Sequence, residues 1–162
     1  MDSIVVFVAK YALFFNLAIA VYVWLRLPRQ QKWEFVAWAV IGGVVALALI
    51  KLGGALFYDT RPFVTDHVAP LIAHAPDNGF PSDHTAASMF AAVLVLYYSR
   101  RWGVAAVVIS LLIGASRIDA HLHRPIDILG AIVIAVVAAL ITFPAARWLT
   151  RRWPLGARKA AA

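Results

Sequence analysis

Long apolar runs separated by short polar connections dominate the chain. Five runs are long enough to consider as membrane-spanning helices, given that about 20 helical residues cross the hydrocarbon core of a bilayer. They cover residues 3–25, 33–57, 84–99, 103–118 and 126–146. None of them alternates apolar and polar residues as a β-strand does, so a transmembrane barrel is excluded. The pattern predicts an all-α integral membrane protein, built as a helical bundle of about five transmembrane helices.

The composition agrees with this interpretation. Of the 162 residues, 63% are hydrophobic and only 14% are charged, whereas a soluble domain is about 25% charged. A soluble domain of this size could not bury so much apolar surface, which excludes soluble, disordered and fibrous proteins. We expect a single membrane domain over residues 1–162, with a catalytic core at about 33–146 and a basic cytoplasmic tail at about 147–162. The chain has no cysteine, which excludes disulfides and thiol catalysis.

The basic residues predict how the bundle is oriented. Ten of the fifteen lie in the connections at 26–32 and 100–101 and in the tail after residue 146. With five spans these three regions share one side of the membrane, and the positive-inside rule makes it the cytoplasmic side. The N-terminus and the connections at 58–83 and 117–125 then face outward. The net charge of +7 is therefore interpreted as attraction to anionic membrane lipid, with no nucleic-acid partner.

Polar residues gather near the predicted outer ends of the second to fifth spans. Such residues are costly at membrane depth and are functional candidates by default. They form three groups: Lys51 with Arg61; Ser82, Asp83 and His84; and Ser116, Arg117, His123 and Asp127. Because all three groups fall at the outer ends of the spans, they predict a single site at one depth in the membrane.

The third group has the spacing of an activated histidine. Pro125 suits the first turn of a helix, so His123 and Asp127 are predicted to meet one helical turn apart. A carboxylate that binds one imidazole nitrogen leaves the other free as a nucleophile or base. The guanidinium of Arg117 would lie beside this pair, where its planar fork matches phosphate oxygens. The alternative for this group is a helix-capping ion pair at the membrane interface with a structural histidine.

The other two groups supply anion-binding features. Ser82 is a natural N-cap, and the helix that follows would direct its first N–H groups and its positive dipole end toward an anion. His84 in the same turn could donate a proton to a leaving oxygen, or be only interfacial. For Arg61 we favour a role as a second phosphate clamp. Lys51 is more simply explained by snorkelling to the headgroups. Together the groups predict a phosphoryl-transfer site that requires no metal and no cofactor.

The order of these residues resembles the type 2 phosphatidic acid phosphatase superfamily of membrane lipid phosphatases. The motifs are Arg61-Pro62, then Pro81-Ser82-Asp83-His84, then Ser116-Arg117 with His123 and Asp127 at the family spacing. The resemblance covers about residues 51–130. It implies that His123 attacks phosphorus to form a phosphohistidine, that Asp127 orients it, and that His84 protonates the leaving group. The phosphate-binding residues that it implies or permits are Arg61, Arg117, Ser82, Asp83, Ser116 and Lys51.

Two positions depart from the broad family pattern. The family places a lysine seven residues before the arginine, where this chain has Gly54, and Lys51 lies about one turn earlier. Asp83 stands where the family usually has glycine, a form that looks like the branch of bacterial undecaprenyl-pyrophosphate phosphatases. That branch implies a polyprenyl pyrophosphate substrate, recycling of the lipid carrier of cell-wall synthesis, and bacitracin resistance. It also implies a multi-pass protein of the bacterial cytoplasmic (inner) membrane whose active site faces the periplasm or the outside.

Several alternatives stay open at this point. Phosphatidic acid or phosphatidylglycerophosphate could be the substrate, because the discriminating surface lies in lipid-facing grooves. A non-catalytic channel would spread its charges along a pore, unlike the single layer seen here. A metalloenzyme could be built on His121 and His123, with His67, His74 or Asp119 as further ligands. The oligomeric state is open, and the pattern assigns no role to Asp59, Asp66, Asp77 and Asp119.

Overall fold

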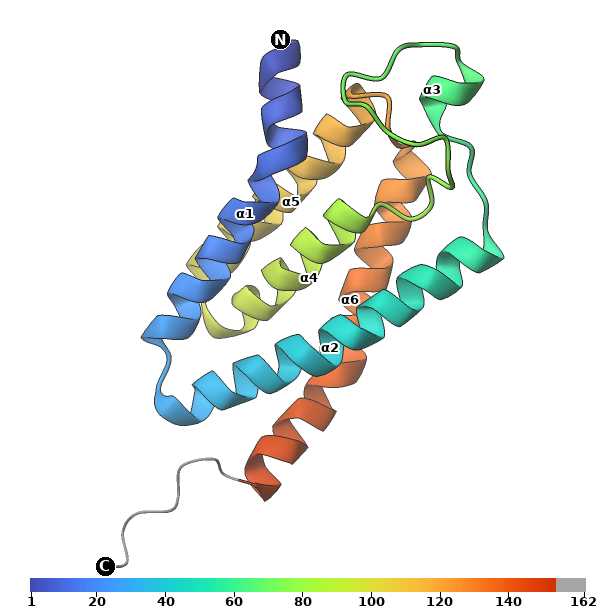
Figure 1. Ribbon diagram of the computed structural model, residues 1–162. Helices are drawn as coiled ribbons and strands as arrows, with labels where there is room; N and C mark the ends of the chain where they lie inside the picture. Colours follow the sequence, from blue (N-terminus) through green and yellow to red (C-terminus); the bar gives the residue numbers. More distant parts are fainter. Residues whose placement is uncertain (154–162) are drawn as a thin grey trace, which may run out of the picture.

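The computed structural model describes residues 1–153 as a bundle of α-helices (Figure 1). Every predicted run forms a helix: α1 (Asp2–Arg26), α2 (Arg29–Leu56), α4 (Asp83–Tyr98), α5 (Arg100–Asp119) and α6 (Pro125–Arg152). The sequence did not predict α3 (Pro62–Thr65), a single turn within the long connection (57–82) between α2 and α4. The all-α fold class is confirmed. Within the described residues, the β-structure consists of one isolated bridge between Thr60 and Asn78.

The last helix continues beyond its apolar run. Pro125 opens α6 in the first turn, as predicted, but the helix ends at Arg152 rather than at residue 146. Arginine and leucine are good helix formers, and positive charge is favourable at the C-terminal end of a helix. The first part of the predicted basic tail is therefore helical. Residues 154–162 of that predicted tail lie outside the described residues.

Four helices, α1, α2, α5 and α6, are long and apolar enough to cross a membrane. The remaining predicted span, the third in chain order, is α4, which has 16 residues. These correspond to about 24 Å of helix against a hydrocarbon core of about 30 Å. It is the central helix, packed against α1, α2, α5 and α6. In Figure 1 it begins below the level at which α5 ends and α6 begins. Four full-length spans thus surround a shorter central helix.

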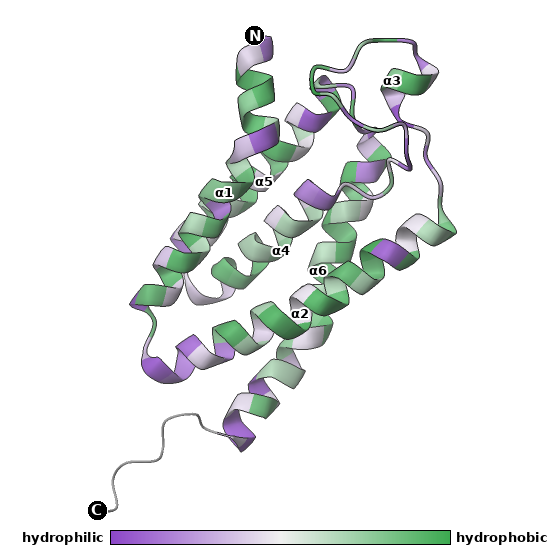
Figure 2. Ribbon diagram, viewed as in Figure 1, coloured by the Kyte–Doolittle hydropathy of each residue, from purple (hydrophilic) through white to green (hydrophobic). Residues whose placement is uncertain are grey.

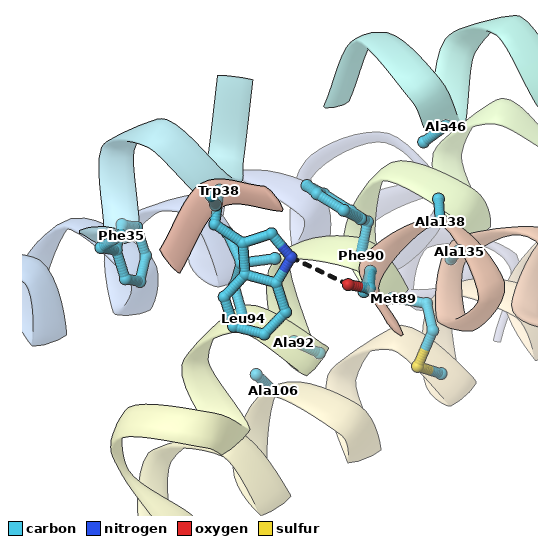
Figure 3. Close-up of a cluster of buried hydrophobic side chains, with 12 residues drawn as sticks. Phe35, Trp38, Ala46, Met89, Phe90, Ala92, Leu94, Ala106, Ala135 and Ala138 are labelled. Carbon is cyan, nitrogen blue, oxygen red and sulfur yellow. Dashed lines mark hydrogen bonds between the residues drawn. The ribbon is translucent and has the colours of Figure 1, made fainter. Parts of the chain in front are cut away.

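Small side chains and internal polar contacts hold the helices together. In the cluster of Figure 3, the indole N–H of Trp38 on α2 donates to the backbone carbonyl of Ala139 on α6 at 2.9 Å. The buried amide of Asn16 on α1 donates to Ser88 Oγ on α4 at 2.7 Å and to Ser110 Oγ on α5 at 3.0 Å. Alanine-rich faces allow close backbone approach, and such hydrogen bonds join helices where no water competes.

Apolar residues run along the long helices, and hydrophilic residues collect toward their ends and in the long connection (Figure 2). Large exposed apolar side chains include Phe14, Val40, Leu111 and Leu140, as expected of a lipid-facing surface. The α1–α2 turn, the α4–α5 turn and the end of α6 lie at one end of the bundle (Figure 1). The long connection and the short connection (120–124) between α5 and α6 lie at the other end. The protein is a multi-pass membrane protein, and the basic residues of the α1–α2 turn, the α4–α5 turn and the end of α6 share one end of the bundle.

Candidate active site

A cavity of about 370 Å³ lies at the end of the bundle that carries the long and short connections. Residues from α2, α4, α5 and both connections form its wall. Six of the predicted site residues line it: Lys51, Arg61, Asp83, His84, Arg117 and His123. Asp127 contacts His123 outside this lining, and Ser82 and Ser116 are buried away from it. The structure thus brings most of the three sequence groups into one polar site.

His123 lies in the short connection, almost completely buried at 3% exposure. Its Nδ1 is 2.9 Å from the carbonyl oxygen of Gly79 and 3.4 Å from Oδ2 of Asp127. Since both neighbours are acceptors, Nδ1 carries the proton and donates it. Nε2 is then unprotonated, and its lone pair accepts a long hydrogen bond of 3.5 Å from a guanidinium N–H of Arg61. One ring nitrogen is fixed by the protein and the other is available for chemistry.

The surroundings of His123 favour the neutral ring. Burial lowers the pKa of His123 below its ordinary value, and the positive charges of Arg117 and Arg61 lower it further. The Asp127 carboxylate opposes these effects through its hydrogen bond to the ring and through its charge. Burial outweighs the carboxylate, so the imidazole is neutral near pH 7. A neutral imidazole with Nδ1 protonated is the form that can attack through Nε2.

Asp127 reaches His123 by a different geometry from the predicted one. His123 is not on the helix, because α6 begins at Pro125 with Arg124 as its N-cap. Asp127 is the third residue of α6, and its Oδ2 accepts the backbone N–H of Arg124 at 2.8 Å. This capping contact turns the carboxylate back toward the short connection and His123. The predicted contact is present, but helix capping rather than a shared helical face produces it.

Hydrogen bonds to three protein groups hold the guanidinium of Arg61 in place. Its Nε donates to Oδ1 of Asp77 at 2.7 Å, and its terminal nitrogens donate to the carbonyl oxygens of Leu122 at 2.9 Å and Asn78 at 3.3 Å. The hydrogen bond from Arg61 holds the pKa of Asp77 below its usual value. A guanidinium so firmly oriented beside His123 Nε2 places fixed positive charge where a phosphoryl group would be transferred.

Arg117 has few protein partners by comparison. It is 5% exposed and lines the cavity. Within the described residues, its guanidinium makes one hydrogen bond to protein, a 3.4 Å contact to the Ala9 carbonyl. Its buried Nε has no partner. Buried donors are normally satisfied, so this unpaired guanidinium N–H, on a residue that lines the cavity, is suited to an anionic ligand.

Lys51 and Gly54 both line the cavity from α2. A Cβ at Gly54 would lie 3.1 Å from the Phe80 carbonyl oxygen, and the Gly54 carbonyl accepts a hydrogen bond from the Asn78 amide at 2.8 Å. The long connection therefore packs directly onto α2 at this position, leaving little room for a side chain. Lys51, one turn earlier, brings a cation to the wall of the same cavity.

Ser82 and Ser116 are not brought to the cavity. Ser82 is the N-cap of α4, as predicted, but its hydroxyl makes no capping bond and instead accepts from Thr85 Oγ1 at 3.1 Å. The hydroxyl of Ser116 donates to the carbonyl of Ile113 at 2.8 Å. Both hydroxyls are used inside the bundle, because buried polar groups in an apolar interior take the nearest backbone or side-chain partner.

The family model of the PAP2 superfamily matches residues 31–151 of the chain. The chain belongs to the PAP2 superfamily. The match covers α2 to α6 and the whole cavity, and it confirms the resemblance predicted from the motifs. In this PAP2 protein, the motif residues Arg61, His84, Arg117 and His123 line one cavity, and their individual roles stay predictions.

Three relatives of this PAP2 protein carry informative names. A Bacillus subtilis (strain 168) protein named undecaprenyl-diphosphatase BcrC is 36% identical over 143 residues, covering 88% of this chain and 74% of the relative. A Bacillus licheniformis protein named bacitracin transport permease protein BcrC is 34% identical, covering 88% and 70%. An Escherichia coli (strain K12) protein named putative undecaprenyl-diphosphatase YbjG is 31% identical, covering 86% and 71%.

The PAP2 motifs leave out several residues that shape the site. Asp77 orients Arg61, and the Gly79 carbonyl is the nearer acceptor for His123 Nδ1. Arg124 contacts Asp59 at 3.6 Å and Asp66 at 3.5 Å, joining the start of α6 to the long connection. No periodicity or motif marks these residues, because their contacts depend on how an irregular segment folds.

The described residues do not form the alternative metal site considered from the sequence. Among residues 1–153, no group of three or more His, Cys, Asp or Glu side chains is arranged to hold a metal ion. His121 does not line the cavity and has a φ of 59° in the turn after α5. His74 does line the cavity, where it lies 3.7 Å from Asp77.

Replacing Asn78 with alanine is expected to destabilise the protein and impair the site. The Asn78 side chain accepts from the N–H groups of Asp59 and Phe80 and donates to the carbonyls of Gly54 and Phe57. Leaving these partly buried groups unpaired costs about 1–3 kcal/mol. Thermal unfolding in detergent measures the loss. His67→Ala, in the exposed part of the same connection, is the control, and equal stability of Asn78→Ala and wild type would contradict this role.

Proposed function

We propose that the protein is a membrane lipid phosphatase that hydrolyses undecaprenyl pyrophosphate to undecaprenyl phosphate and inorganic phosphate. The observation that carries the proposal is the neutral, buried His123, whose free Nε2 lies beside Arg61 at a cavity lined by cations. The names of the Bacillus and Escherichia relatives support the substrate. We place the protein in the bacterial cytoplasmic membrane with the cavity facing the periplasm or outside, because its basic regions lie at the opposite end of the bundle.

In the proposed first step, Nε2 of His123 attacks the terminal phosphorus of the lipid pyrophosphate. The bond from that phosphorus to the bridging oxygen breaks, and His84 protonates the leaving lipid phosphate. Asp127 and the Gly79 carbonyl stabilise the Nδ1–H of the ring as it becomes cationic. Water then attacks the phosphohistidine, with His84 accepting its proton, and inorganic phosphate leaves. One water is consumed, and His123 returns to its neutral form.

The cationic side chains stabilise the charge that moves during this transfer. Arg117 has free donors for non-bridging oxygens, and Arg61 presents fixed positive charge beside the attacking nitrogen. Lys51, at the wall of the cavity, is placed to neutralise the negative charge of the second phosphate group. Phosphoryl transfer is accelerated chiefly by positioning and by electrostatic stabilisation, and these residues supply both.

An apolar groove supports a long lipid chain as the rest of the substrate. It has a volume of about 900 Å³ along α1, α2 and α4. It shares Ile50, Lys51 and Asp83 with the polar cavity, so the groove and the cavity adjoin. A pyrophosphate in the cavity would leave its isoprenoid chain against the groove, where burial of apolar surface is favourable. The charged lining stays at one end of the bundle, which disfavours a channel.

Phosphate release from purified protein tests the proposed function. Undecaprenyl pyrophosphate, phosphatidic acid and phosphatidylglycerophosphate are compared in detergent with a chelator present. Chelator-resistant release with the highest kcat/KM for undecaprenyl pyrophosphate supports the proposal. Preference for either glycerophospholipid assigns a different substrate to the same site. No release from any of the three by folded protein rejects the phosphatase function.

Replacing Gly43 with phenylalanine is expected to weaken binding of the long-chain substrate selectively. Gly43 lines the groove, and a Cβ added there has no neighbour within 4 Å, so the ring would fill the groove without disturbing the fold. We expect KM for undecaprenyl pyrophosphate to rise by about 5–10-fold. Activity toward farnesyl pyrophosphate, whose chain is much shorter, should stay within about 2-fold.

The control for this variant is Val44→Phe. Val44 is on the same helix but is exposed and lies outside the groove lining. It should leave both substrates unaffected. Equal effects of Gly43→Phe on the long and the short substrate would show that the chain does not lie in this groove.

A further inference from the structure

The first helix, α1, carries a completely buried polar side chain, Asn16. Its amide nitrogen lies within hydrogen-bonding distance of three acceptors on the neighbouring helices. They are the Ala106 carbonyl oxygen at 2.9 Å and Ser110 Oγ at 3.0 Å on α5, and Ser88 Oγ at 2.7 Å on α4. Since a carbonyl oxygen only accepts, the Ala106 contact fixes which end of the amide faces α5. Asn16 therefore joins α1 to both neighbours at a single level of the bundle.

The same two helices, α1 and α5, meet again nearer the cavity, at Arg117. Ala9 lies seven residues before Asn16 on α1, and Arg117 lies seven residues after Ser110 on α5. Seven residues are about two helical turns, so the two positions on each helix share a face. The helices run in opposite directions (Figure 1), which brings Ala9 and Arg117 to the same level. There the Arg117 guanidinium donates to the Ala9 carbonyl at 3.4 Å.

We propose that Asn16 is a positioning residue for Arg117, because it fixes the register of α1 at which the Ala9 carbonyl meets the guanidinium. A backbone carbonyl moves only when its helix moves, so the orientation of Arg117 depends on how α1 lies against α5. Apolar side chains pack at several registers along such an interface, whereas a buried amide meets its partners at one. The order of contacts is α4 and α5 to Asn16, then along α1 to Ala9, and from there to Arg117.

Helix association alone does not explain the amide. Oδ1 of Asn16 is buried and has no partner among residues 1–153, and a buried acceptor without a partner is unfavourable. The serine hydroxyls of the cluster do not require the amide. Ser88 and Ser110 lie 2.9 Å apart, and Ser110 donates to the Ala106 carbonyl at 2.9 Å. Leucine, of similar volume, would therefore pack at position 16 without leaving these groups unpaired, but it would not fix the register.

The PAP2 motifs do not include this contribution. The residues matched to the family begin at residue 31, after α1, and the motif residues lie on the later helices and connections. Yet α1 provides the one hydrogen-bond acceptor that the Arg117 guanidinium has within the part of the chain that the structure describes. It also lines the apolar groove through Leu17 and Val21. The first helix thus borders the groove and contacts a residue of the cavity.

The catalytic consequence rests on the proposed phosphatase function, in which Arg117 presents its free donors to phosphate oxygens. A guanidinium that has lost the Ala9 contact would sample several orientations, and part of the preorganised positive charge would be lost. The competing interpretation is that Asn16 serves only the stability of the bundle. That interpretation predicts a lower Tm with normal phosphate binding and normal turnover by the folded protein.

Asn16→Leu separates these interpretations. We expect it to lower kcat/KM for undecaprenyl pyrophosphate by about 10-fold and to lose most of the increase in Tm that inorganic phosphate produces in wild type. Thr142→Val is the matched control. Thr142 is also buried, but its hydroxyl donates within α6, to the Ala138 carbonyl, so both quantities should be kept. If Asn16→Leu kept the kcat/KM and the phosphate-dependent increase in Tm, the proposal would be overturned, whatever its own Tm.

A double-mutant cycle tests whether Asn16 acts through Arg117. Residues that act through one another give non-additive losses, whereas independent residues give additive ones. Asn16→Leu combined with Arg117→Lys should therefore lower kcat/KM no further than Arg117→Lys alone. A double variant that is about 10-fold worse than Arg117→Lys would show that Asn16 acts elsewhere and would overturn the proposal.

The register of α1 can be measured without substrate. Because the chain has no cysteine, spin labels can be attached to cysteines introduced at Ile4 on α1 and Leu112 on α5, which are both exposed. In lipid nanodiscs, Asn16→Leu should shift or broaden the distance distribution between the labels, and Thr142→Val should not. Identical distributions in wild type and Asn16→Leu would overturn the proposal. Wild-type protein that hydrolyses none of the lipids, while Asn16→Leu shows this change, supports the register role and rejects the proposed function alone.

Discussion

Replacing His123 with alanine is expected to lower phosphate release by at least about 10³-fold, because the substitution removes the attacking nitrogen. The ring is buried, with Nδ1 donating to the Gly79 carbonyl and Nε2 beside Arg61. No other imidazole has this arrangement within the described residues. His84 lines the same cavity, but in the proposed mechanism it transfers protons and cannot replace the nucleophile. The loss should therefore appear in kcat.

The control for this prediction is His121→Ala. His121 is two residues away in the same short connection, but it does not line the cavity. It should leave activity within about 2-fold of wild type, because this half-buried side chain contributes no group to the site. Rapid quenching with substrate labelled on the terminal phosphate should trap label on wild-type protein and none on His123→Ala. Normal turnover by His123→Ala would exclude the phosphohistidine, whichever lipid is hydrolysed.

The sequence was sufficient to predict the helices because each depends on a local property. Apolar runs of sufficient length predicted α1, α2, α5 and α6, and the proline at residue 125 predicted the start of the last helix. The central position of α4 was not predictable in this way. Its apolar run is as short as the next one along the chain, and only its contacts with four neighbouring helices show that it is the central one.

The site was predictable where chemistry requires a side chain at a fixed spacing. His123, Arg117 and His84 fall in motifs, and the structure places all three at one cavity. The contacts that orient them were not predictable. The Gly79 carbonyl has no side-chain signature, and irregular backbone of the long connection separates Asp77 from Arg61 in the sequence. Backbone acceptors and loop contacts of this kind become visible only when the long connection is folded.

Replacing Arg117 with lysine is expected to lower kcat/KM by about 10²-fold, although the positive charge is kept. The Arg117 guanidinium is buried at the cavity with its Nε unpaired, and within residues 1–153 it makes one hydrogen bond to protein, at 3.4 Å. Its donors are thus free for two phosphate oxygens at once. Lysine offers a point charge on a flexible chain and cannot form the bidentate contact. Arg61 differs, because its donors are largely occupied by Asp77 and by backbone carbonyls.

Anion binding provides a measurement of this role that does not depend on turnover. Inorganic phosphate should raise the Tm of the wild-type protein, since a ligand that binds only the folded state stabilises it. Arg117→Lys should lose most of this increase. Arg101→Lys, at the opposite end of the bundle beside Trp102, should keep it. If Arg117→Lys retained both full kcat/KM and the phosphate-dependent increase in Tm, the unpaired guanidinium would have another partner, and the phosphate would have to be held by Arg61 and Lys51.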